Sequence, residues 1–293
     1  MKIIDFHVHA GNFGLLRSDI QELLLHRQIE PEYKVAKVFS EPETMENYLK
    51  MNDVYRAVLL AECGPGTNYT IDSQKIIDFS QKKDIFIPFG NINPNYHDPK
   101  NEFCKSIKLG VKGFKFYPAD HEFNPLIEKM QYVYKMCELL GLPILFHTGL
   151  TGQKDTEQKF IKPFDFKPLA QEYPDLVILL AHGGKPHWYE EASTMALTFP
   201  NVYIDSALID PLSLKQAFLN QKKLQKKIVF GSDWPVVGSY STLLKKYQSA
   251  NIADDILFDI FSANAERILQ ESFKKQNQAI PQFLLEMSSV ETN

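Results

Sequence analysis

The chain contains eight short apolar runs, rich in β-branched and aromatic residues, each of which stops at a polar residue or at Gly or Pro. The runs cover residues 3–9, 56–62, 85–93, 113–118, 143–149, 177–183, 202–207 and 228–235. Stretches with helical periodicity lie between them, for example 74–81, 101–109, 126–140 and 212–224. Nearly continuous apolar strands that alternate with helices predict a parallel sheet covered on both faces.

Eight such units within 293 residues predict a closed (β/α)8 TIM barrel, with a doubly wound open sheet as the alternative. No GxGxxG or GxxxxGK[ST] motif follows a predicted strand, which disfavours a nucleotide-binding open sheet. The connection 10–55, with helical segments at 19–27 and 44–52, is long enough to form a lid. The polar connection 150–167 is expected to line the pocket. We expect a barrel domain over residues 1–270, closed by an amphipathic helix at 254–269, and a peripheral C-terminal tail at 271–293.

The composition, 44% hydrophobic and 23% charged, is that of a globular protein. A net charge of 32 − 36 = −4 disfavours a general nucleic-acid binder, which needs a basic surplus. Three distant cysteines without a CxxC motif exclude a disulfide framework and indicate a reducing compartment. The N-terminal sequence contains an acid and two histidines where a signal peptide would be apolar, and no long apolar run follows. We therefore expect a cytoplasmic protein without membrane or nucleic-acid partners; a homodimer is compatible with the sequence.

Polar side chains concentrate at the ends of the predicted strands. They are His7, His9, Glu62, Asn91, Asn93, Lys115, Tyr117, His147, His182, Asp205 and Asp233. In a parallel barrel all these strand ends lie on one rim, where the connecting loops build the active site. His7 and His9 are two residues apart, so a strand directs both imidazoles to the same face. Three imidazoles and one carboxylate suit Zn²⁺, with Mn²⁺, Fe²⁺ or Co²⁺ as alternatives, and leave a position open for water.

Six motifs together resemble the amidohydrolase superfamily, specifically its amidohydrolase-related (amidohydrolase 2) branch of metal-dependent TIM-barrel hydrolases and decarboxylases. They are DFHVHAG at 5–11, GFKFYP at 113–118, GLPILFHTG at 141–149, AHGG at 181–184, GSDWP at 231–235 and FSANAERIL at 261–269. They follow the family's order and span nearly the whole chain.

The resemblance implies that His7, His9, His147 and Asp233 bind one divalent metal ion. His182 is then the acid/base beside the substrate, or a ligand of a second ion. The resemblance favours an unmodified Lys115 that binds a substrate carboxylate over a carboxylated lysine that bridges two ions. Asp205 is expected to orient a neighbouring side chain.

The first functional hypothesis is a hydrolase that uses a metal-activated water on an ester, lactone or amide of a small molecule, with Asp233 and His182 moving protons. The alternative is a non-oxidative decarboxylase of an aromatic or unsaturated carboxylic acid. A non-catalytic metal-binding or ligand-binding barrel is the third reading. The predicted substrate contacts are Lys115, Tyr117, Glu62 and Trp188, whereas His26, His97 and His121 are expected at the surface.

Overall fold

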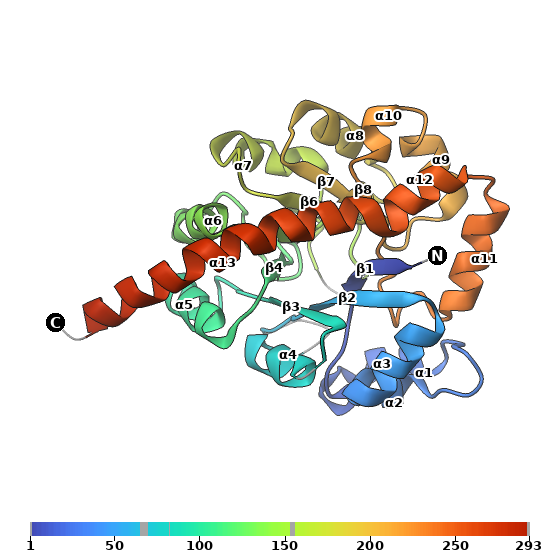
Figure 1. The fold of residues 1–293 in the computed structure, drawn as a ribbon, viewed down its shortest axis with the longest axis horizontal. Helices are drawn as coiled ribbons and strands as arrows, with labels where there is room; N and C mark the ends of the chain where they lie inside the picture. Colours follow the sequence, from blue (N-terminus) through green and yellow to red (C-terminus); the bar gives the residue numbers. More distant parts are fainter. Residues whose placement is uncertain (1, 65–69, 82, 153–155, 292–293) are drawn as a thin grey trace.

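Eight parallel strands, hydrogen-bonded in chain order, form the centre of the molecule (Figure 1). The computed structural model describes residues 2–64, 70–81, 83–152 and 156–291, with side chains described through residue 285. The strands are β1 (Ile3–Val8), β2 (Val54–Leu60), β3 (Phe86–Gly90), β4 (Gly113–Phe116), β5 (Ile144–His147), β6 (Ile178–Ala181), β7 (Val202–Asp205) and β8 (Ile228–Val229). The Phe6 N–H donates to Phe230 O at 2.8 Å, and Val8 forms a parallel bridge to Trp234, so β8 returns to β1. The predicted TIM barrel is confirmed.

The helices surround the strands and follow them in alternation (Figure 1). They are α1 (Ser18–Leu25), α2 (Val35–Ser40), α3 (Pro42–Met51), α4 (Ser73–Ser80), α5 (Pro99–Leu109), α6 (Glu128–Leu140), α7 (Lys167–Glu172), α8 (Tyr189–Thr198), α9 (Pro211–Phe218), α10 (Lys222–Gln225), α11 (Tyr240–Ser249), α12 (Asp254–Phe258) and α13 (Asn264–Glu291). Local sequence sets several of their ends. Asp98 caps α5 by accepting from the Asn101 N–H, Pro99 occupies the first turn, and Gly110 ends the helix at φ +96°.

Apolar side chains fill two regions of the barrel. The larger core lies between the strands and the surrounding helices. The smaller core fills the barrel interior; its members include Ile4, Phe6, Val58, Leu60, Ile87, Phe89, Leu145, Leu179 and Val229, together with Ala265, Ile268 and Leu269 of α13. Because these α13 side chains pack with inward-facing strand residues, α13 closes one end of the barrel. The polar rim residues therefore lie at the other end of the barrel.

The C-terminal helix is longer than the sequence predicts. The predicted closing helix 254–269 consists of α12, a π-helical turn at Asp259–Ala263, and the start of α13. The segment expected to be a peripheral tail is helical through Glu291, and residues 292–293 lie outside the described part. Ser272 and Gln276 donate to Gly141 O, and Phe283 packs edge-on against Phe103. Figure 1 shows this helix running past α5 and α6.

Other element boundaries also differ from the prediction. Within the predicted strand 228–235, the strand itself covers only Ile228–Val229, because the following loop turns toward β1, where the Asp233 N–H donates to His7 O at 2.8 Å. The predicted helix 212–224 is divided into α9 and α10. The insertion between β1 and β2 contains α1 and α3 where expected, and also α2, which was not predicted.

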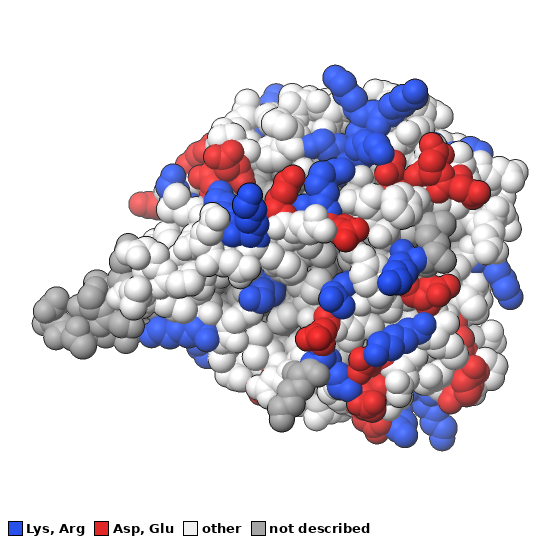
Figure 2. Space-filling view, in the orientation of Figure 1, with Lys and Arg blue, Asp and Glu red and all other residues white. Residues whose placement is uncertain are grey.

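Basic and acidic side chains are mixed over the face that α13 crosses (Figure 2). Four lysines lie on and beside α10: Lys222, Lys223, Lys226 and Lys227. Lys226 is paired with Asp259 at 2.5 Å, and the Lys227 ammonium lies over the Tyr203 ring at 4.2 Å. No helix among the described residues is both long and apolar enough to cross a membrane.

Candidate metal centre and active site

The end of β1 brings two histidines to the rim. The β1–β2 register shifts between Asp5 and Val8, and both Phe6 and His7 face the barrel interior: Phe6 packs on Phe89, and His7 Nε2 lies 3.3 Å from Lys115 Nζ. His9 lies on the same side, because His7 Nε2 and His9 Nε2 are 3.6 and 3.1 Å from Asp233 Oδ1. The expected convergence of the two imidazoles is therefore present.

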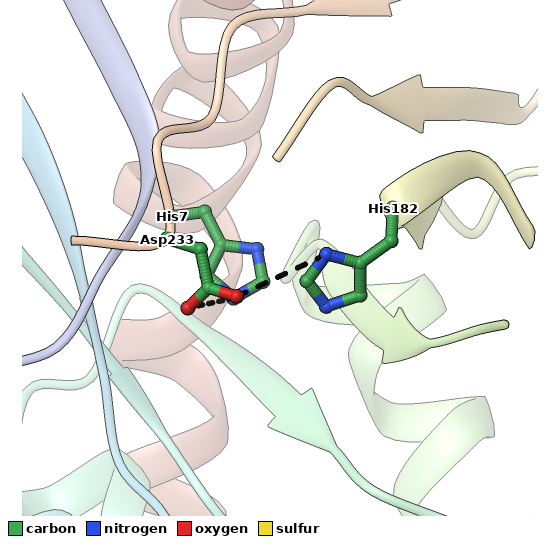
Figure 3. A group of neighbouring side chains, drawn as sticks. All are labelled: His7, His182 and Asp233. Carbon is green, nitrogen blue, oxygen red and sulfur yellow. Dashed lines mark ion pairs between the residues drawn. The ribbon is translucent and has the colours of Figure 1, made fainter. Parts of the chain in front are cut away.

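Asp233 and His182 reach the site from the loops after β8 and β6. Both residues adopt the left-handed backbone region, with φ values of 60° and 61°, which non-glycine residues seldom occupy. Such strained positions concentrate at functional sites. Figure 3 shows His7, His182 and Asp233 pointing toward one another from three different segments. One ligand atom from each of the three lies within 4.8 Å of those of the other two.

His147 completes the group from the end of β5. Its ring centroid is 4.7 Å from that of His182, which in turn is 4.9 Å from His7. All five of these side chains, His7, His9, His147, His182 and Asp233, line one cavity. The sequence therefore identified residues that the fold brings together. Which four of them bind the ion stays a prediction: the tightest described group contains His182, whereas the family resemblance assigns His9 and His147.

A second layer of residues fixes His7. Asp205 Oδ2 is 2.5 Å from His7 Nδ1, and Asp205 Oδ1 accepts from the Ala207 N–H. This carboxylate leaves His7 Nε2 directed toward Asp233, as is typical of metal-binding histidines. Gly231 is required for the arrangement, since a Cβ at this position would lie 1.9 Å from Asp205 Oδ1.

Asp5 ties the ends of β1 and β8 together. Its carboxylate accepts from the backbone N–H groups of His7 and Ser232 and, at 2.6 Å, from the Tyr240 hydroxyl. Burial raises the pKa of Asp5 to about 6, although these hydrogen bonds oppose the rise. Asp5 thus holds the backbone on which both His7 and Asp233 stand.

The electrostatics of the site favour neutral imidazoles and an ionised carboxylate. Burial lowers the pKa of His147 well below its usual range, and it does the same to His182, aided by His147 and His7. Burial acts to raise the pKa of Asp233, but His7 and the hydrogen bond from His9 outweigh it and hold that pKa well below its usual range. Neutral imidazole and carboxylate are the forms that bind divalent metal ions.

The residues fit a divalent metal ion. Among the described residues, His147 Nε2 is buried and has no hydrogen-bond partner. Such a buried polar atom destabilises the fold unless a ligand binds to it. It joins a set of nitrogen and oxygen donors that lie within a few ångströms of one another and are suited to Zn²⁺ or a similar ion. The rim histidines and Asp233 would hold such an ion at the floor of the cavity.

The cavity above this cluster measures about 260 Å³, just below the usual range for ligand pockets. The insertion after β1 covers part of it, since Ile20, Leu23 and Leu24 of α1 line its wall. Leu150, Thr151 and Gly152 line another part, so both predicted loops reach the pocket; residues 153–155 of the second loop lie outside the described part. The volume admits a substrate of about one ring or a short chain.

Three of the four predicted substrate contacts line this cavity: Glu62, Lys115 and Tyr117. Lys115 is fully buried, and burial lowers its pKa to about 8 against the opposing effects of Asp233 and Asp205. Its ammonium lies 4.9 Å from the centre of the Tyr117 ring, as expected for side chains on one face of β4. Trp188 is placed elsewhere, at the start of α8 beside His187 and Lys162, and is not among the described residues that line the cavity.

Two charged residues of the cavity were not predicted, Asp120 and Lys185. Asp120 lies three residues after Tyr117, and Lys185 lies three residues after His182. This closeness to predicted site residues was the sequence feature that could have identified them. Burial raises the pKa of Asp120 to about 6, with Thr151 and Lys115 opposing the rise. Burial also lowers the pKa of Lys185.

One predicted surface residue is buried instead. His121 is 3% exposed, packed between Tyr117 and Phe123, whereas His26 is exposed and His97 half-buried. Its polarity suggested the surface, but the loop after β4 folds inward to form the cavity wall. Burial lowers the pKa of His121 to about 3.

Solved structures with the same fold come from several bacteria. An uncharacterized TIM-barrel protein from Bordetella bronchiseptica aligns over 93% of this chain and 99% of its own, with a TM-score of 0.77 and 20% identity. A probable 2-pyrone-4,6-dicarboxylic acid hydrolase from Acinetobacter baumannii aligns over 92% and 100%, with a TM-score of 0.65 and 15% identity. The 2,6-dihydroxybenzoate decarboxylase from Rhizobium aligns over 92% and 99%, with a TM-score of 0.62 and 15% identity. At these identities the likeness concerns the fold.

Sequence comparison identifies the family. A curated relative, Protein fluG of Emericella nidulans, is 32% identical over 75 residues, which are 26% of this chain and only 8% of that protein. The family model described as Amidohydrolase matches residues 4–270, which include every residue of the candidate metal centre. The chain belongs to the amidohydrolase family.

Proposed function

We propose that the protein is a hydrolase that cleaves an ester, lactone or amide bond of a small molecule, with water as the nucleophile. The observation that carries the proposal is the buried group of His7, His182 and Asp233, whose ligand atoms lie within 4.8 Å of one another at the floor of a small cavity. A divalent ion bound there, for which Zn²⁺ is best suited, would lower the pKa of water to about 7 and polarise a carbonyl.

The chain's own residues supply the proton transfers. Asp233 lines the cavity and is ionised, so it would accept the proton of the attacking water at a carboxylate oxygen. His182 Nδ1 lies 4.0 Å from Asp233 Oδ2, so the two groups share a region from which a proton can pass to the leaving group. His182 Nδ1 also lies 3.1 Å from Ala207 O, which orients the ring.

Lys115, Tyr117 and Glu62 are proposed to position the substrate. The buried Lys115 ammonium would bind a carboxylate or the carbonyl oxygen, since no other cation is as deep in the described part of the cavity wall. The apolar side chains of α1 would shield the reacting group from bulk water. A small substrate is consistent with the volume, and a cytoplasmic location with the three free cysteines.

Isotope incorporation tests the proposal. The Zn-loaded protein is incubated with short lactones, esters and amides and with aromatic carboxylic acids, in H₂¹⁸O and in D₂O. Hydrolysis is expected to place ¹⁸O in the product carboxylate and, with esters and lactones, to release a proton. Asp233→Asn should reduce both signals by at least about a hundredfold. Release of CO₂ with deuterium on the carbon that carried it would overturn the proposal and assign the decarboxylase function.

A further inference from the structure

Asp120 is an incompletely bonded acid in the cavity wall. It lies on the loop between β4 and α6, is 7% exposed, and lines the cavity. The Thr151 side chain hydrogen-bonds to its carboxyl group. Within the described residues its Oδ1 is buried and has no hydrogen-bond partner. A buried carboxylate oxygen without a donor is destabilising, so this atom is suited to receive a donor from a bound molecule.

Three other buried acids around the site do not share this property. Asp5 accepts three hydrogen bonds, Asp205 accepts from His7 and Ala207, and Asp233 is contacted by His7 and His9. These three carboxylates are used by the protein itself to build the metal centre. Asp120 comes from a different loop, and its free oxygen leaves it available to a ligand.

Two ammonium groups line the same cavity. Lys115 extends from β4, and Lys185 follows the β6 histidine. Both attract an anionic group, which complements the acceptor at Asp120. Other parts of the wall are apolar, with Ile20 and Leu24 from the insertion after β1 and Leu208 and Val236 from the later loops. A ligand that matches this lining has an acidic group, a short apolar body and a hydrogen-bond donor.

We propose that Asp120 is the specificity-determining residue of the cavity and accepts a hydrogen bond from a hydroxyl or amino group of the substrate. The substrates are thus derivatives of short hydroxy acids or amino acids, with the donor group separate from the bond that is cleaved. This inference rests on the proposed function only for the cleavage step. The recognition itself is a matter of binding and can be measured without turnover.

The test measures binding of matched acids to the Zn-loaded full-length protein by isothermal titration calorimetry. The probes are ω-hydroxy and ω-amino acids with three to six carbons, each paired with the unsubstituted acid of the same length. At pH 8 the Asp120 carboxyl is ionised, since its pKa is about 6. At one chain length the donor-bearing acid is expected to bind at least about tenfold more tightly than its partner, as a hydrogen bond to a charged group provides.

Three variants locate the effect. Asp120→Leu should abolish the preference, whereas Thr151→Val, which removes the neighbouring hydrogen bond but keeps the carboxylate, should retain it. Lys185→Met should weaken both members of a pair equally. If Asp120→Leu does not fold, as judged by circular dichroism, Asp120→Asn serves instead and should lose about tenfold in affinity for the ω-amino acids.

Two results would overturn the proposal. One is no preference in the wild-type protein at any chain length. The other is survival of a preference where it should be lost, which means either preference in Asp120→Leu or the amino preference in Asp120→Asn. Failure of the proposed hydrolysis is a different result, because it appears in the isotope experiment and leaves this binding comparison intact. Loss of the hydroxyl preference only in Asp120→Leu, together with loss of the amino preference in both variants, would support the proposal and show that charge adds to recognition of the amine.

Discussion

The two halves of the rim differ in how their polar groups are bonded. On the half formed by β1, β7 and β8, the His7 ring is paired with Asp205, and the carboxylates of Asp5 and Asp205 accept from backbone N–H groups. On the half formed by the loops after β4 and β5, polar atoms of Asp120, His121 and His147 are buried without hydrogen-bond partners in the described structure. The first half is fixed by the protein alone, and the second contains atoms that a ligand can satisfy.

This difference separates positioning from recognition. Catalytic groups must be held in place before the substrate arrives, so their neighbours are fully bonded. Groups that recognise a ligand remain unsatisfied until it binds, at a cost to the stability of the free protein. The proposed ion and substrate would account for the unbonded atoms of His147 and Asp120. His121 lines no described cavity, so its unbonded nitrogens destabilise the protein without a ligand to satisfy them.

The largest expected effect is on the bonded half, at Asp233. Asp233→Asn should lower kcat by about 10²- to 10⁴-fold, because an amide cannot accept the proton from water. Steady-state kinetics on the substrate found in the isotope screen would measure this. Asp255→Asn, an exposed change on α12, is the matched control and should leave kcat near that of the wild type. Full activity in Asp233→Asn would contradict the assigned role.

Metal content tests whether the five rim residues act as one site. Elemental analysis of protein purified without chelator should find about one divalent ion per chain, and His7→Ala should lose it together with turnover. About two ions per chain would instead place His182 and Lys115 among the ligands. Retention of the ion and of activity in His7→Ala would show that the cluster is not the metal centre.

The second layer should have a smaller influence. Asp205→Asn should weaken metal affinity by about 10- to 100-fold, because it removes the carboxylate that orients His7. Competition with a chromogenic chelator would measure the change. Gly231→Ala should act in the same direction, since its Cβ would displace Asp205. Unchanged affinity in both variants would mean that the bonded half does not depend on Asp205.

His121 provides the smallest test, on the unbonded half. Its pKa is about 3 in the folded protein and near 6.5 in the unfolded chain, so acid favours unfolding between these values. His121→Phe removes this titration. On going from pH 7.5 to pH 5, the unfolding free energy of the wild type should therefore fall by about 2 kcal/mol more than that of the variant. Urea denaturation at both pH values cancels contributions from the other buried histidines, and an equal change in both proteins would contradict the prediction.

Much of the fold could be read from local pattern. The eight apolar runs lie on the eight strands, because strands buried on both faces carry apolar residues almost without interruption. The amphipathic periods mark most helices, because only one face of such a helix is buried against the barrel. The predicted ends of the elements were less accurate. β8 is short because the loop after it is hydrogen-bonded to β1, and α13 extends further because Ser272 and Gln276 donate hydrogen bonds to Gly141 O. These are contacts between distant segments.

The sequence by itself determined the barrel, the rim position of its histidines, and the family to which they point, because strand period and strand ends are local properties. The sequence predicted that Asp205 orients a neighbour, but only the tertiary structure decided that this neighbour is His7. It also decided that Trp188 lies outside the cavity, and that Asp120, Lys185 and His121 turn inward. Loops have no periodicity from which the direction of a side chain follows. Their course depends on which distant groups they meet, and that is settled only when the barrel has closed.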